Sequence, residues 1–345
     1  MRRIMNRSLP KFVSLPACPA LLCALLCALT TASAVTAALA PLSALAQSYP
    51  NRVVRVIVPY PPGGTVDAVA RVVSLRLGEQ LGQTFIVENR AGANGVIGSD
   101  VVAKAQPDGY TLLVQASTFV TNPILLKNLP YDMMRDFTPV SNIGSVPLIV
   151  TAHPGVAAND LKEFIAQVLA SPTRYTFAAP PTGSAGHLAE EAIKSGARLG
   201  IQLIPYKGTA PALADVMGGH VSALIDALPS SYPQVKGGKL KALAVTSPKR
   251  IAFLPNVPTV AESGLPGFDM VSWYGLWGPA HLPRELAKRL SDEVAKAVRS
   301  PLAVERLGEQ GFDAVGSTPE EFSAFLEQEL VKYTRIIKQA NIKVE

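Results

Sequence analysis

Apolar runs of strand length alternate with segments of helical periodicity along most of the chain. Residues 52–60, RVVRVIVPY, form one such run, and TVDAVARVVSLRLGEQLG follows it with Val69, Val73 and Leu77 on one helical face. Further strand-like runs follow, with helical patterns between them: TFIVEN, YTLLVQAS, RYTFAAP, IQLIPY, HVSALIDAL and KLKALAVTS. This alternation predicts an α/β fold in which parallel sheets are covered by helices.

Two other strand-like segments indicate how the chain divides. SVPLIVTAHPG and FDMVSWYGLWGPAHLP both contain boundary prolines, which suits connections between domains. We therefore expect a first domain made of residues 47–147 and 251–345, with residues 148–250 inserted as a second domain. Two long amphipathic helices complete the first domain, and the later one begins with the capping box Thr318–Glu321. Ligands of such sheets bind beyond the carboxyl ends of the strands, so two facing domains would form a cleft.

Residues 1–46 have the pattern of a secretory signal peptide. Four basic residues precede the apolar stretch LLCALLCALTTASAVTAALA, and Ala44 and Ala46 provide small residues for cleavage before Gln47. The leucines before the cysteines of this stretch are too bulky for a lipoprotein cleavage site. We expect export to the periplasm without a lipid anchor, and the alternative is an uncleaved membrane anchor.

Composition excludes several classes of site once residues 1–46 are set aside. All three cysteines lie in that segment, so the remaining chain has no disulfide, Cys–Zn site or thiol nucleophile. The segment also holds four of the 32 basic residues and none of the 26 acidic ones, which lowers the formal net charge from +6 to +2. No basic stripe suited to nucleic acid is found. The four histidines show no metal-ligand spacing, so neither a metal nor another cofactor is expected.

The turn after the first strand, PYPPGGTVD, contains Gly63, Gly64, Thr65 and Asp67. A strand that stops here and feeds a helix leaves backbone N–H groups that can bind an anion. The turn is neither a P-loop nor a dinucleotide-binding loop. The pattern leaves an alternative open, a tight turn in which Thr65 is the N-cap and Asp67 interacts with the helix dipole.

Other loop–helix junctions carry glycine or polar residues without a catalytic set. GANGVIG, at residues 92–98, lacks the spacing of a nucleotide loop and predicts a second backbone turn. Thr182 stands where a nucleophile elbow needs glycine, so Ser184 is interpreted as a helix cap or a ligand donor, and His187 as structural. Asp226 ends the strand SALID, where it either faces the cleft or caps the next helix near Ser230.

Seven longer segments carry a family resemblance: YPNRVVRVIVPYPPGGTVDAVAR, GQTFIVENRAGANGVIGSDVVAKAQPDGYTLL, NLPYDMMRDFTPV, GSAGHLAEE, IPYKGTAPALADVMGGHV, KLKALAVTSPKRIAFLPNVPTVAESGLPGF and SWYGLWGPA. In this order they resemble the Bug/TctC family, the periplasmic solute receptors of tripartite tricarboxylate transporters. The segments cover nearly all of the chain after residue 46.

The resemblance implies a type II periplasmic-binding-protein fold, with two α/β domains whose parallel-rich sheets surround a ligand cleft. It also implies that backbone N–H groups and ordered water at two first-domain loops hold one ligand carboxylate, while second-domain loops face the rest of the ligand. The matching positions are Tyr60, Gly63, Gly64, Thr65, Asp67, Ser117 and Thr118 in the first domain, and Thr182, Gly183, Ser184 and Asp226 in the second. Pro181, beside Pro180, departs from the usual family glycine and removes an N–H donor, which leaves the identity of the carboxylate open.

The expected function is a non-catalytic, monomeric receptor that delivers a small carboxylate to membrane permease subunits. A dicarboxylate or tricarboxylate, an acidic amino acid and an aromatic acid all remain candidates. Two alternatives also remain. One is a secreted esterase-like hydrolase that uses Ser184 and His187, and the other is a receptor that signals to a sensor kinase.

Overall fold

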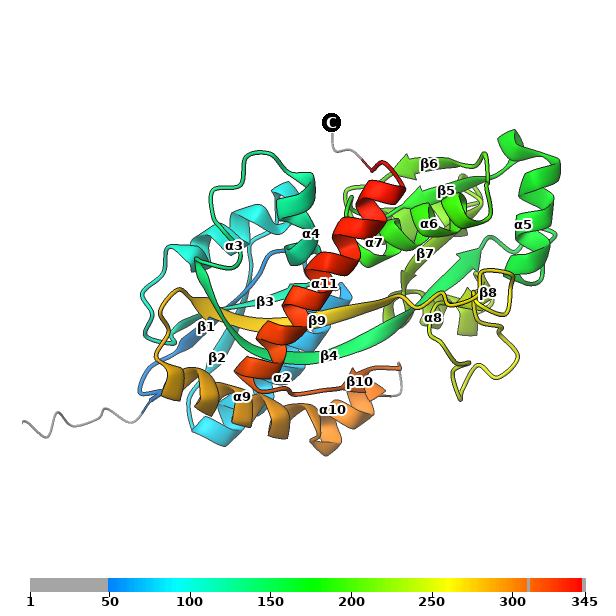
Figure 1. The fold of residues 1–345 in the computed structure, drawn as a ribbon. Helices are drawn as coiled ribbons and strands as arrows, with labels where there is room; N and C mark the ends of the chain where they lie inside the picture. The colour runs from blue at the N-terminus through cyan, green and yellow to red at the C-terminus, as the bar shows by residue number, and fades with distance from the viewer. Residues whose placement is uncertain (1–48, 309–310, 343–345) are drawn as a thin grey trace, which may run out of the picture. The chain divides into compact units, whose positions relative to one another are not determined.

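The computed structural model describes residues 49–308 and 311–342 (Figure 1). The expected signal peptide and its cleavage site lie outside these residues. From Pro50 onward the described chain forms one compact unit. Within the described chain, no helix is long and apolar enough to cross a membrane.

Strands and helices alternate as the sequence predicts, and each strand-like run contains a strand. The strands are β1 (Val54–Val58), β2 (Phe85–Asn89), β3 (Thr111–Ala116), β4 (Phe137–Ala152), β5 (Thr176–Ala179), β6 (Gln202–Pro205), β7 (Ala223–Ala227), β8 (Lys241–Val245), β9 (Val271–Pro279) and β10 (Asp313–Ala314). The helices are α2 (Thr65–Leu81), α3 (Val96–Ala103), α4 (Thr118–Leu125), α5 (Leu161–Ala170), α6 (Ala185–Gly196), α7 (Thr209–Met217), α8 (Leu228–Lys236), α9 (Arg284–Val298), α10 (Pro301–Arg306) and α11 (Pro319–Gln339), with 3-10 turns η1 (Ala93–Gly95) and η2 (Pro172–Arg174).

The first group of strands has the order β2–β1–β3–β9–β4, and β10 pairs with β4. β1 runs parallel to β2 and β3, whereas β9 is antiparallel to both β3 and β4. Because β1 and β3 are parallel neighbours, their carboxyl ends meet at one edge of the sheet. The β1–α2 turn and the β3–α4 junction therefore lie side by side at that edge.

The second group of strands has the order β4–β7–β5–β6, and β8 also pairs with β4. β5, β6 and β7 are mutually parallel, so the loops that follow them share one edge. β4 belongs to both groups, because residues 137–147 pair with β9 and residues 148–152 pair with β7. The division into domains at residues 147/148 and 250/251 stays a prediction.

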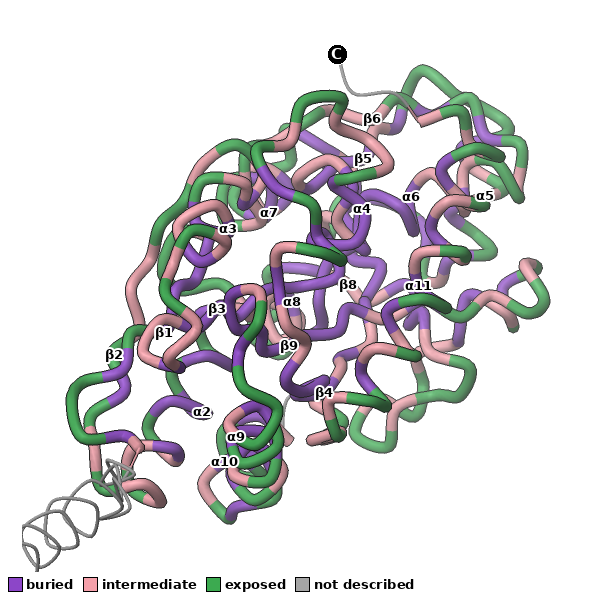
Figure 2. The backbone as a smooth tube through the Cα atoms, turned by 60° about the vertical axis from the view of Figure 1, so that its left-hand side comes forward, coloured by how far each residue is buried: buried purple, intermediate pink, exposed green. Residues whose placement is uncertain are grey.

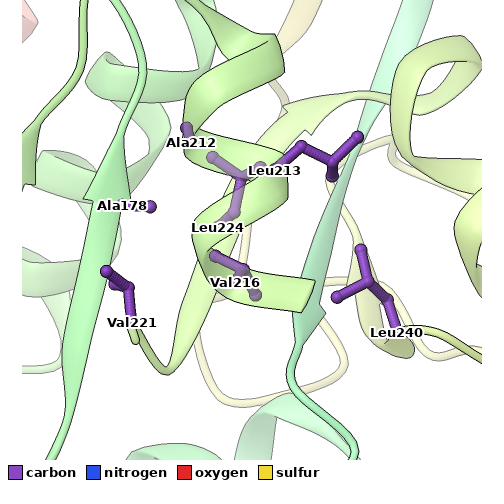
Figure 3. Packing of buried hydrophobic residues seen from close by; sticks show 7 residues of the cluster. All are labelled: Ala178, Ala212, Leu213, Val216, Val221, Leu224 and Leu240. Carbon is purple, nitrogen blue, oxygen red and sulfur yellow. The ribbon is translucent and has the colours of Figure 1, made fainter. Parts of the chain in front are cut away.

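Buried residues, purple in Figure 2, occupy the middle of both groups of strands. In the first group, Trp273 and Trp277 of β9 pack against Phe322 of α11, which crosses β9 and β4 in Figure 1. In the second group, α7 packs on β5 and β7 through a cluster of aliphatic side chains (Figure 3). The cluster comprises Ala178, Ala212, Leu213, Val216, Val221, Leu224 and Leu240. The two cores hold the loop-bearing strand ends in place.

The predicted capping box at Thr318 is confirmed, and α5 has a side-chain cap of the same kind. Thr318 and Glu321 form the expected capping box at the start of α11. At α5, where Asn159 or Asp160 would suit the cap, the Asp160 carboxylate accepts a hydrogen bond from the Glu163 N–H. Both caps follow the rule that a short polar side chain satisfies the free amides of the first turn.

Candidate ligand-binding site

The β1–α2 turn ends at a helix N-terminus that has no side-chain cap among the described residues. Gly64 is the N-cap, with φ −84° and ψ 171°. The alternative in which Thr65 is the N-cap is wrong, because the helix already begins at Thr65. The Thr65 hydroxyl instead lies 3.0 Å from Ser230 Oγ. Amides of a first helical turn have no partner within the helix, so those of Thr65 and Val66 are available to an external acceptor.

Asp67 fixes the shape of this turn from inside the protein. Its Oδ2 accepts a hydrogen bond from the Gly63 N–H at 3.0 Å, and Arg71 forms an ion pair with the same carboxylate. Asn89 Nδ2 donates both to Asp67 Oδ1 and to the Tyr60 carbonyl. Burial raises the pKa of Asp67, but the hydrogen bonds from Arg71, Gly63 and Asn89 outweigh it, so the pKa is lowered. The Gly63 amide is thus already engaged.

Three residues at the carboxyl ends of β1 and β3 carry buried polar groups. Tyr60 Oη, Gln115 Nε2 and Ser117 Oγ are buried and have no hydrogen-bond partner in the described part of the chain. Gly95 lies against two of them, because a Cβ there would come within 2.6 Å of Gln115 Nε2 and 3.4 Å of Tyr60 Oη. Burial raises the pKa of Tyr60 well above its usual value, so its hydroxyl stays neutral. Such groups commonly hold ordered water.

The β3–α4 junction provides the second turn at this edge. Ser117 is 1% exposed, and its N–H donates to the Trp273 carbonyl at 3.1 Å. Thr118 begins α4 and is also buried. Ser117 therefore offers only its hydroxyl toward an external partner.

The β5–α6 loop of the second group contains the remaining loop residues. Ser184 is the N-cap of α6, where its Oγ accepts from the His187 N–H at 3.3 Å, so its interpretation as a cap is confirmed. His187 Nδ1 accepts from the Gly183 N–H at 3.2 Å. Burial lowers the pKa of His187 to about 4, which keeps the imidazole neutral. The imidazole is therefore used to fix the Thr182–Ser184 loop.

Direct hydrogen bonds join the loops of the two groups of strands. Asn94 Nδ2 donates to the Thr182 carbonyl at 2.8 Å, and Thr121 Oγ1 donates to the Gly183 carbonyl at 2.8 Å. Gly183 has φ +80°, and a Cβ there would come within 2.7 Å of Thr121 Oγ1. Only a glycine allows this close approach without strain. Together with the contact between Thr65 and Ser230, these bonds bring the predicted loops of both groups together.

Asp226 lies at the carboxyl end of β7, as the sequence predicts. The residue is 7% exposed, and Oδ1 accepts a hydrogen bond from Thr209 Oγ1 at 3.2 Å. The alternative role as a cap for α8 is not supported, because no side-chain cap is found at Ala227 within the described structure. Burial raises the pKa of Asp226 to about 6, although the nearby polar groups of Ala227, Thr209 and Ser230 act to lower it.

The sequence analysis missed two residues near the site, Gln115 and Tyr274. Gln115 lies inside an apolar strand, and Tyr274 lies in an aromatic segment that otherwise predicts core. Burial raises the pKa of Tyr274 well above its usual value, and the nearby Asp226 adds to the effect. A polar residue within a buried strand is the pattern that could have pointed to Gln115. Across the described residues, no cluster of His, Cys, Asp or Glu could hold a metal ion.

Comparisons with known proteins agree with this fold. The family model described as "Tripartite tricarboxylate transporter family receptor" matches residues 69–342. Protein BugT of Bordetella pertussis (strain Tohama I) is 37% identical over 308 residues, which are 89% of this chain and 94% of BugT.

Solved structures give the same picture. The periplasmic binding protein BugD superposes with a TM-score of 0.81 at 34% identity, covering 86% of this chain and 100% of BugD. MatC from Rhodopseudomonas palustris, solved with bound malate, superposes with a TM-score of 0.78 at 29% identity, covering 84% of this chain and 100% of MatC. The expected periplasmic-binding-protein fold is confirmed.

Proposed function

The chain belongs to the tripartite tricarboxylate transporter receptor family, and from this premise we propose that it is a periplasmic receptor for a small carboxylate. The receptor holds one carboxylate at the amino end of α2 and delivers the ligand, without chemical change, to the permease subunits of a tripartite transporter. It acts as a monomer after removal of its signal peptide. MatC, a relative of similar fold, was solved with malate, which supports a carboxylate as the ligand class.

The observation that carries the proposal is the uncapped N-terminus of α2. No described side chain caps this 17-residue helix, and a Cβ at Gly64 would meet no atom within 4 Å. The helix dipole and the free first-turn amides favour an anion at this place. A carboxylate has the size and charge to accept from the amides of Thr65 and Val66 together.

The buried groups behind the turn support a wet carboxylate site. Tyr60 Oη, Gln115 Nε2 and Ser117 Oγ each lack a partner in the described chain, although each is buried. An unsatisfied buried polar group costs about 1–3 kcal/mol, so ordered water or ligand oxygen is expected there. Asp67, by contrast, serves the turn itself, because its carboxylate is occupied by Gly63, Arg71 and Asn89.

The geometry around Ser184 does not favour the esterase alternative. Ser184 Oγ caps α6, and His187 Nδ1 accepts from a backbone N–H of the same loop. A serine nucleophile needs its hydroxyl hydrogen-bonded to a base that a third group orients. Ser184 and His187 are each used to hold the loop, which suits a binding role.

The test is a thermal-melt screen of the exported protein against small carboxylates and their amide or methyl-ester analogues. A ligand that binds only the folded state adds RT ln(1 + [L]/Kd), about 2.7 kcal/mol at a hundredfold excess over Kd. We expect at least one carboxylate to raise the melting temperature while its neutral analogue has little effect. Equal shifts from acid and neutral analogue, or turnover of the ester that Ser184→Ala abolishes, would contradict the proposed function.

A further inference from the structure

Asp226 is a buried carboxylate in which only one of the two oxygens has a hydrogen-bond partner within the described chain. Oδ1 accepts from Thr209 Oγ1 at 3.2 Å, whereas Oδ2 is buried without a hydrogen-bond partner among the residues described. No Lys or Arg of the described chain forms an ion pair with it. Burying a charge without a counter-ion is costly, so the free oxygen points to a partner that arrives from outside.

The position of Asp226 relates this oxygen to the proposed carboxylate site. Ser230, at the start of α8, lies near enough to Asp226 to lower its pKa, and its Oγ lies 3.0 Å from Oγ1 of Thr65. Thr65 is the first residue of α2, so one serine side chain separates Asp226 from the helix end that would hold the carboxylate. Both Asp226 and Thr65 affect the pKa of the buried Tyr274 hydroxyl, so Tyr274 lies near both.

The charge of Asp226 limits what can face it. A second ligand carboxylate at this point would be repelled by a like charge in a poorly solvated place. A hydroxyl or ammonium group would instead donate to Oδ2 and satisfy it. Because Ser230 is the residue between Asp226 and Thr65 at the amino end of α2, we place this donor on the carbon next to the held carboxylate.

We propose that Asp226 determines ligand specificity by accepting a hydrogen bond from a hydroxyl or ammonium group next to the ligand carboxylate, so that the receptor selects 2-hydroxy- or 2-aminocarboxylates over unsubstituted acids. This inference rests on the proposed carboxylate-receptor function. Thr209 holds Oδ1 and thereby directs Oδ2 toward the ligand.

The experiment is calorimetric titration of the exported protein with matched acids of three lengths. The probes are propionate, lactate and alanine; succinate, malate and aspartate; and glutarate, 2-hydroxyglutarate and glutamate. In the set that binds best, we expect a substituted acid to bind at least tenfold more tightly than the unsubstituted one. Asp226→Ala should remove this preference. Asp226→Asn separates the donors, because an amide oxygen still accepts from a hydroxyl but no longer pairs with an ammonium.

Glu190→Gln is the matched control. Glu190 of α6 is a second buried carboxyl whose Oε2 also lacks a partner in the described chain, and its Oε1 accepts from the Ile225 N–H at 3.1 Å, a bond that glutamine can keep. The preference should survive this change. If an unsubstituted acid binds as tightly as its substituted partners, or if Asp226→Ala retains the preference, Asp226 is not the selecting residue while the carboxylate function stands. If none of the nine acids binds, the proposed function itself fails for these ligands, and the inference fails with it.

Discussion

Gly64 is the single residue at which the carboxylate hypothesis can be tested most directly. Its φ of −84° and ψ of 171° are open to any residue, and a Cβ there would meet nothing within 4 Å. Gly64→Val should therefore fold, while its side chain occupies the space beside the free amides. We expect binding of the best carboxylate to weaken at least about tenfold, or 1.4 kcal/mol, in calorimetric titration.

Asp67→Asn is the comparison variant for Gly64→Val, because it changes the same turn without adding bulk beside the free amides. The amide oxygen can still accept from the Gly63 N–H, but the side chain loses the ion pair with Arg71 and the hydrogen bond that Asn89 donates to Oδ1. Because the Arg71 side chain is half exposed, the lost ion pair should cost about 1 kcal/mol or less and the lost hydrogen bond about 1 kcal/mol more, with affinity unchanged while the Gly63 bond remains. If the Gly64→Val protein folds and binds the carboxylate normally, the carboxylate site does not lie at this turn.

Asp226 should also make stability depend on pH at the level of one residue. Burial raises its pKa from 3.8 to about 6, so between these values the folded state binds more protons than the unfolded state. The contribution of Asp226 to the free energy of unfolding therefore falls as pH rises and is most unfavourable above about pH 6. Without ligand, Asp226→Asn should be more stable than the parent at pH 7, by about 3 kcal/mol at most, and nearly equal to it near pH 4.

Urea denaturation at several pH values between 4 and 7.5 measures this difference. If the difference in free energy of unfolding between Asp226→Asn and the parent does not change with pH, Asp226 titrates normally in the folded protein. A variant that is less stable than its parent at pH 7 would mean that the carboxylate has an internal partner. The expected result, a residue that costs stability in the empty protein, is the usual mark of a group kept for binding.

At the scale of elements, hydrophobic periodicity predicted the type and order of structure well. The apolar runs became β1 to β3 and β5 to β8, and the mostly apolar β1, β3 and β7 are the most buried of them. The sequence did not predict α4, α10 or the two-residue β10. α4 contains Pro123 and lacks a charged face, so its helical pattern is hidden, and it is held by its contact with α11.

The length of β4 was also missed, for a different reason. We expected a strand near residues 145–155, but β4 runs from Phe137 to Ala152. Its earlier half contains Pro139 and Gly144, which weaken a strand pattern, and its pairing with β9 shifts register twice there. Only the long-range partner β9 shows that this irregular stretch is a strand.

The site could be predicted in part, because loops at the carboxyl ends of parallel strands are local features. The sequence alone located the β1–α2 turn, Ser184 as a cap and Asp226 at a strand end. It could not show that Gly63 is already bonded to Asp67, since that requires the folded turn. Nor could it show which polar groups stay unpaired, because Gln115 and Ser230 meet their neighbours only through the tertiary fold.

At the scale of the whole molecule, ligand binding should be linked to the contacts between the two groups of strands. Thr121 Oγ1 donates to the Gly183 carbonyl at 2.8 Å, and this bond is buried. Thr121→Val keeps the shape of the side chain but leaves that carbonyl without its donor. A buried hydrogen bond contributes about 1 kcal/mol, so the arrangement in which the loops meet becomes up to about fivefold less populated.

If the ligand binds only that arrangement, its apparent affinity falls by the same factor of up to about five. Thr151→Val is the matched control, because Thr151 is equally buried but donates to the Leu224 carbonyl within the second group of strands alone. The Thr151→Val change should lower the melting temperature without changing the affinity for the carboxylate. Titration of both variants with the best carboxylate, together with small-angle scattering of the ligand-free proteins, measures the effect. Equal affinities for the two variants would mean that these loops stay together whether or not ligand is bound. Ligand affinity would then not depend on the contact between the loops.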